Sequence, residues 1–191
     1  ALQAFRDGNF KDAYEALRRL LTSPDASTEG IEENLSTAIQ SLQRLNRVDE
    51  IDPLLEQTVA AHAKSWQVLA AVASQYNSIE HFGYMIGDEF HRGQHRGQGR
   101  VVHATARDRV QALQLFRRAV ELAAASPDKA EAARVLSGLA QTLAYNGDTS
   151  QYWRLQSLTG LTSLPYYEEG WGPNYSGLQG APVGADGKPI Y

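Results

Sequence analysis

Hydrophobic residues recur at intervals of three and four along most of the chain, a spacing that places them on one face of an α-helix. The clearest example runs from Glu29 to Leu45, with Ile31, Leu35 and Leu42 on the same face. This spacing also predicts a helix that follows Gly8 and ends at Leu21, and further helices over 48–62, 65–76, 108–120 and 136–143. The pattern therefore predicts an all-α fold.

Glycine and asparagine mark the turns between these helices. Gly8, Asn46, Asn77 and Gly147 stand where one helix should end and the next begin, and both residue types tolerate a positive φ. The four turn residues are 38, 31 and 70 positions apart. The first two spacings bracket the roughly 34-residue period of a common helix-pair repeat. We interpret the third as one period plus an insertion.

The residues around these turns resemble the tetratricopeptide repeat. Gly8 is followed by aromatic Phe10, small Ala13 and then Pro24, an order similar to the second half of such a repeat. A later unit resembles both helices of the repeat. The positions that match are Trp66, Leu69, Ala70 and Ala73 in the first helix, and Ala112, Phe116 and Ala119 in the second. A last helix, with Tyr152 in a position where a small residue is expected, matches less well.

This resemblance implies a right-handed α-solenoid of antiparallel helix pairs over residues 1–158. One long loop insertion at about 78–105 would interrupt it. Residues 159–191, rich in glycine, proline and aromatic residues, would form an extended arm or a linker to a following domain. Both ends of the chain look cut, so we expect a fragment of a larger protein.

The insertion is apolar and aromatic at first, then rich in glycine, arginine and histidine. We favour an ordered loop whose aromatic residues pack on the helices while the charged residues stay exposed. Flexible backbone amides beside arginines can also bind anions such as phosphate or RNA. The residues of this alternative anion site are Arg92, His95, Arg96 and Arg100. A metal site at His91 and His95, or acid–base catalysis by these histidines, is a weaker alternative.

Composition narrows the possible functions. The chain has 191 residues and a net charge of −4, which argues against binding nucleic acid over a broad surface. It contains no cysteine, so disulfides, thiolate nucleophiles and cysteine-ligated zinc are excluded. No apolar run approaches the roughly 20 residues that span a bilayer. We expect no cofactor and no metal, and the composition does not define the oligomeric state.

Three further segments resemble a more specific family. They are 87–97 (GDEFHRGQHRG), 107–113 (RDRVQAL), and 167–172 (YEEGWG) followed by 180–183 (GAPV). Together they resemble the N-terminal helical region of large bacterial proteins of the α-2-macroglobulin type, as found in planctomycetes. The resemblance implies an exported, multidomain protein that traps proteases. The family's thioester requires a cysteine that this chain lacks, so the resemblance assigns no functional residue here.

The function predicted from the repeat pattern is a non-catalytic scaffold that binds protein. The partner would be another chain or an adjacent domain of the same polypeptide, held on the first helices of the pairs. The polar residues predicted to line that surface are Gln40, Gln43, Gln67, Ser74, Arg134, Ser137 and Gln141. Anion binding through the basic insertion and an enzyme using its histidines are the alternatives.

Overall fold

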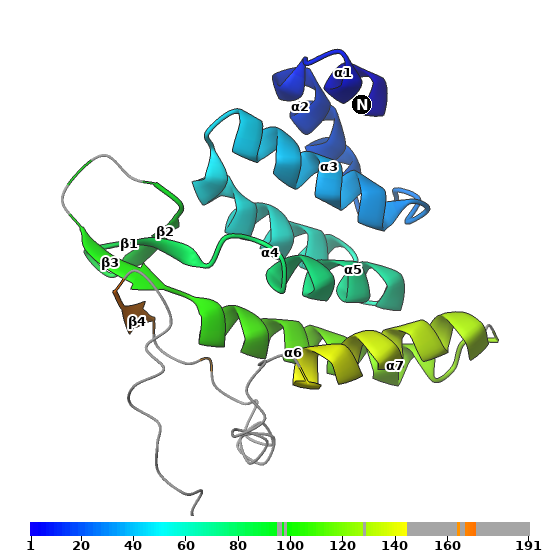
Figure 1. Cartoon of the computed structure of the whole chain (residues 1–191). Helices are drawn as coiled ribbons and strands as arrows, with labels where there is room; N and C mark the ends of the chain where they lie inside the picture. The colour runs from blue at the N-terminus through cyan, green and yellow to red at the C-terminus, as the bar shows by residue number, and fades with distance from the viewer. Residues whose placement is uncertain (95–96, 98, 128, 145–163, 165–166, 171–191) are drawn as a thin grey trace, which may run out of the picture.

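The computed structural model describes residues 1–191 except 95–96, 98, 128, 145–163, 165–166 and 171–191. The described part is mostly helical, with a small antiparallel sheet at one edge of the helices (Figure 1). The helices are α1 (Leu2–Arg6), α2 (Phe10–Leu21), α3 (Ile31–Arg44), the 3-10 turn η1 (Val48–Glu50), α4 (Ile51–Ala61), α5 (Trp66–Tyr76), α6 (Thr105–Ala123) and α7 (Lys129–Ala144). The strands are β1 (Phe82–Ile86), β2 (Glu89–Arg92), β3 (Arg100–His103) and β4 (Glu168–Glu169).

Most helices that are neighbours in the chain pack on each other, and the chain descends from α1 to α7 through a stack of helices (Figure 1). α2 packs on α3, α5 packs on α6, and α6 packs on α7. The first helices of the predicted pairs also meet one another, because α3 contacts both α1 and α5, and α5 contacts α7. The predicted helical character is thus confirmed for most of the described residues.

The apolar core runs through these helix contacts. Leu17, Leu35, Leu69 and Ala112 have no exposed side-chain surface, as their spacing predicted. Small residues at the seams let helix axes approach each other, and each buried aliphatic side chain contributes about 1.5–3 kcal/mol of transfer free energy. The core therefore accounts for the cohesion of α2 to α6.

Three of the four predicted turn residues lie in the described part of the chain, and two of them have the expected backbone conformation. Gly8 (φ 81°) and Asn46 (φ 56°) adopt the left-handed conformation expected of them. Asn77 does not, because its φ is −80° and the backbone stays right-handed. Its side chain instead donates a hydrogen bond of 2.7 Å to the hydroxyl of Thr142 on α7. Gly147 lies outside the described residues, as does the helix predicted around Tyr152.

The prediction of a loop at about 78–105 is wrong, because this segment contains three strands of a sheet. β1 pairs antiparallel with β2 through a two-residue turn, Gly87-Asp88, in which Gly87 has a φ of 60°. β3 pairs antiparallel with the other edge of β1. The strand order is β2-β1-β3-β4. The fold is therefore not purely α-helical.

A short part of the predicted C-terminal arm joins this sheet. β4 pairs antiparallel with β3, and the ring of Tyr167 stacks on Phe90 at a centroid distance of 4.5 Å. The guanidinium of Arg107 lies 5.0 Å from the same Tyr167 ring. The rest of the arm, including residues 171–191, lies outside the described residues. In the part of the chain that is described, we find no helix both long and apolar enough to cross a membrane.

Candidate functional site

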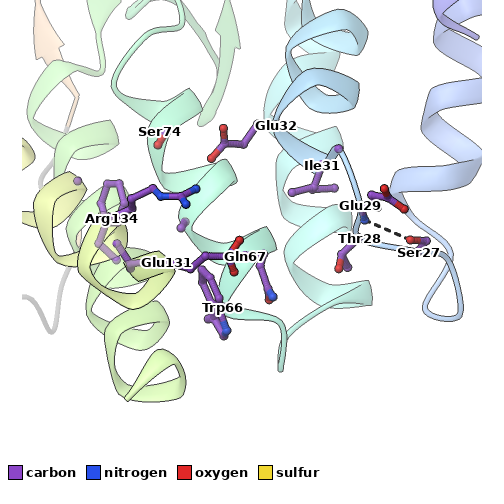
Figure 2. A pocket seen from close by; sticks show the side chains of 15 residues that line it. Ser27, Thr28, Glu29, Ile31, Glu32, Trp66, Gln67, Ser74, Glu131 and Arg134 are labelled. Atoms are coloured by element: carbon purple, nitrogen blue, oxygen red, sulfur yellow. Dashed lines mark hydrogen bonds between the residues drawn. The ribbon is translucent and has the colours of Figure 1, made fainter. Parts of the chain in front are cut away.

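A groove of about 590 Å³ lies between α3, α5 and α7. The segment 27–30, which leads into α3, forms one side of it, and residues of α5 and α7 between 66 and 74 and between 131 and 138 form the other two. Figure 2 shows Glu131 and Arg134 of α7 near Trp66 and Gln67 of α5, with Thr28 and Glu29 across from them. The groove thus brings together three segments that are far apart in the sequence.

Helix α5 supplies the central wall through one stripe of side chains. Trp66, Gln67, Ala70 and Ser74 line the groove. Ser65 caps the helix, since its hydroxyl accepts a hydrogen bond of 3.4 Å from the amide of Val68. Trp66 is half-buried and packs against the core, which leaves part of the indole facing the groove. This fixes a large aromatic surface on a rigid helix.

Helix α7 supplies the second wall through residues whose spacing places them on one face of the helix. They are Glu131, Arg134, Val135 and Gly138. Gly138 allows a close approach to α6, because a Cβ atom at this position would lie 2.8 Å from the ring of Phe116. Phe116 itself reaches the groove floor. Arg134 is exposed, so its guanidinium is accessible to solvent at the groove.

The segment before α3 closes the third side. Gly30 adopts a left-handed φ of 65° and begins the helix, so that Glu29 and Glu32 both line the groove. The hydroxyl of Ser27 accepts a hydrogen bond of 3.2 Å from the amide of Glu29. With Glu131, these side chains bring the charged residues of the groove lining to three carboxylates and one arginine, Arg134. The groove lining is therefore net acidic and carries one aromatic anchor.

Three of the seven residues predicted to bind a partner line this groove. They are Gln67, Ser74 and Arg134. The four that lie outside its lining, all exposed on α3 or α7, are Gln40, Gln43, Ser137 and Gln141. In the sequence, Trp66 was used only to match the first helix of a repeat, and Glu131 and the segment 27–30 were missed. Glu131 precedes Arg134 by three positions, and this helical spacing is a signal that could have found it.

The predicted anion site is not assembled around Arg92. Its side chain is only 1% exposed and is held by two carboxylates. The guanidinium donates hydrogen bonds of 2.9 and 2.7 Å to Asp52 on α4, and of 2.8 and 3.0 Å to Asp108 on α6. It also donates to the backbone oxygen of Glu80. Arg92 is therefore a buried internal ion-pair partner, which corrects the expectation of an exposed basic loop.

The electrostatics of this cluster keep Arg92 charged. Burial alone would lower the pKa of the Arg92 guanidinium, but hydrogen bonds to Asp108 and Asp52 outweigh that effect and raise the pKa. His81 adds a contact, since its Nδ1 lies 2.7 Å from an Asp108 oxygen. The cluster joins β2 to α4 and α6, so it positions the sheet against the helices.

The remaining members of the predicted anion site are not brought to Arg92. Arg100 is exposed on β3 and forms an ion pair of 2.6 Å with Glu169 of β4. His95 and Arg96 lie outside the described residues. Among the residues that are described, no three histidine, aspartate or glutamate side chains are grouped so that they could hold a metal ion.

Comparison of the chain with family models, with curated proteins and with solved structures found no match.

Proposed function

We propose that this chain is a non-catalytic protein-binding module that holds a segment of another chain, or of an adjacent domain, in the groove between α3, α5 and α7. The observation that carries the proposal is the presence of half-buried Trp66 and exposed Arg134 in one groove. Tryptophan and arginine are enriched among the residues that dominate binding energy in protein interfaces. Both stand on helices packed against the core, which limits the entropy lost on binding.

The helix arrangement supports a tetratricopeptide-like α-solenoid. α1, α3, α5 and α7 contact one another in turn, which is the arrangement expected of the first helices of stacked pairs. In such an array these helices present the surface that binds extended segments. The groove lies on α3, α5 and α7, which are three of those helices. The resemblance to the α-2-macroglobulin-type proteins stays a prediction.

The lining favours a partner segment with basic and apolar residues. Glu29, Glu32 and Glu131 outnumber Arg134, so a lysine or arginine side chain would find more carboxylates than cations there. The Trp66 indole offers an apolar face over which a cation can also be placed. Electrostatic complementarity of this kind selects partners and speeds their association.

A display selection tests this proposal and does not require the natural partner. Random peptides would be selected on the immobilised full chain, and the affinity of each selected peptide measured by fluorescence anisotropy. We expect Arg134→Glu to strengthen the binding of basic peptides by about tenfold or more, equivalent to about 1.4 kcal/mol, because it replaces the one cation of the lining by another carboxylate. The matched control Arg19→Glu reverses an exposed charge on α2, outside the groove, and should leave the affinity unchanged. Equal binding to both variants would contradict the proposal.

A further inference from the structure

A second pocket, of about 430 Å³, lies between α4 and α6 and shares no residue with the groove. Val59 and Ala60 of α4 and Leu115 of α6 form its apolar walls. The polar residues that line it are Glu56, Tyr76, Gln111, Gln114, Arg117 and Arg118. Its volume is in the range of about 300–1,000 Å³ that is typical of small-molecule sites.

Tyr76, the last residue of α5, has a hydroxyl without a hydrogen-bond partner among the described residues. Its side chain is only 3% exposed, yet the hydroxyl forms no hydrogen bond within the described part of the chain. The hydroxyl is also not among the fully enclosed polar atoms, so the pocket gives solvent access to it. Leaving a buried polar group without a partner costs about 1–3 kcal/mol. Such a group, directed into a pocket, is suited to bind a ligand.

The charge around Tyr76 defines what its hydroxyl can bind. Burial raises the pKa of Tyr76, and the charges of Asp52 and Glu56 raise it further, so the hydroxyl remains a hydrogen-bond donor. These same carboxylates repel an anion at that point. The acceptor that suits the Tyr76 hydroxyl is therefore a neutral oxygen, such as a carbonyl.

The opposite end of the pocket is cationic. Arg117 and Arg118 are exposed on α6 and line the pocket rim. Their contacts in the protein are long, since Arg117 lies 3.7 Å from Glu121 and Arg118 donates over 3.5 Å to the backbone oxygen of Ala63. Such weak surface contacts are readily exchanged for a hydrogen-bonded carboxylate.

We infer that this pocket binds a small amphiphilic acid of the N-acyl amino acid type. Its acyl chain would lie on Val59, Ala60 and Leu115, and its amide oxygen would accept the hydrogen bond of Tyr76. Its carboxylate would pair with Arg117 and Arg118. The inference does not depend on the proposed function, because it rests on a different pocket.

Calorimetric titration of the full chain with N-octanoylglycine tests the inference. We expect saturable binding that weakens about fivefold in Tyr76→Phe, since one hydrogen bond contributes about 1 kcal/mol. The methyl ester of the probe should bind more weakly than the acid, because it has no charge for the arginines. Ala60→Trp, at an exposed wall position, should abolish binding by filling the pocket.

Two controls keep the test decisive. Circular dichroism and thermal melting establish that Tyr76→Phe and Ala60→Trp are folded, and Arg19→Glu, an exposed position on α2 outside both pockets, should bind N-octanoylglycine like the unmodified chain. An absence of binding would overturn the inference. Binding that persists in folded Ala60→Trp would overturn it as well, because the probe would then bind elsewhere.

Discussion

The helical body and the strand insertion are held in place by different forces. Between the helices, contacts are made by fully buried aliphatic residues such as Leu35 and Leu69. The sheet is held to the helices by a charged cluster, in which Arg92 of β2 joins Asp52 and Asp108. Apolar contacts tolerate substitutions that conserve volume, whereas a buried charge depends on each of its partners. The two regions should therefore respond differently to mutation.

The largest expected effect is in the helical body. Ala112 has no exposed surface and lies where α6 packs on α5, so Ala112→Arg would force a charge into an apolar seam. We expect a loss of about 4 kcal/mol or more in the free energy of unfolding, sufficient to unfold many domains. Circular dichroism with urea denaturation measures it. A variant with an unchanged midpoint would show that this seam is not part of the core.

The next largest loss of stability is expected in the charged cluster. Arg92→Ala leaves Asp52 and Asp108 without their shared cation, and removing one partner of a buried ion pair costs about 3–5 kcal/mol. We expect hydrogen exchange to accelerate first in β1 to β3, before the helices are affected. Simultaneous loss of helix and sheet protection would contradict the separation of the two regions.

Gly83→Ala should disturb the sheet alone. A Cβ atom at Gly83 would lie 2.6 Å from the ring of Phe90, in addition to crowding the backbone oxygen of His91. We expect a loss of about 1–3 kcal/mol, the range for overpacked sites. Gly87→Ala is a useful comparison, because nothing lies within 4 Å of its Cβ position and only its positive φ opposes the change. Equal effects of the two substitutions would contradict the packing argument.

Alkaline pH should lower the free energy of unfolding through Tyr76, whose pKa is affected by the charged cluster between the sheet and the helices. Burial, followed by the charges of Asp52 and Glu56, raises the pKa of Tyr76, so the folded protein keeps its proton above the pH of about 10 at which an unfolded tyrosine ionises. The unfolded state then binds fewer protons, and the free energy of unfolding falls as pH rises above about 10. In Tyr76→Phe this fall should be less steep. Urea denaturation at a series of pH values measures the slope.

The smallest effect is expected at Arg100, which belongs to the same insertion as Arg92. Arg100 is 61% exposed and its ion pair with Glu169 faces solvent. Exposed pairs contribute about 0–1 kcal/mol, so Arg100→Ala should barely change the melting temperature. If Arg100→Ala lowered the melting temperature as much as Arg92→Ala does, exposure would not decide how much these ion pairs stabilise the protein.

The sequence predicted the helices well because their signal is local. The helix predicted to follow the Gly8 turn and to end at Leu21 is α2, and the predicted helix 29–45 brackets α3 closely. The sheet was missed because its strands are short and the segments between them contain several glycines, although the dipeptide Gly87-Asp88 is a hairpin signal. Part of the groove was predicted, since Gln67, Ser74 and Arg134 follow from helical spacing.

What could not be predicted depends on contacts between distant residues. Arg92 reaches partners 40 and 16 positions away in the chain, and no local pattern distinguishes it from exposed Arg100. The groove side formed by the segment 27–30 depends on how α3 packs beside α5. Such features follow from tertiary packing rather than from periodicity.

The most direct test of the protein-binding groove is hydrogen exchange of the chain with and without a selected peptide. We predict slower exchange in 27–32, 66–74 and 131–138, the segments that line the groove, and no change in the α6 segment 111–118 apart from Phe116 on the groove floor. Protection confined to 111–118, to the sheet or to the exposed face of α2 would contradict the account, because the peptide would then bind outside the groove.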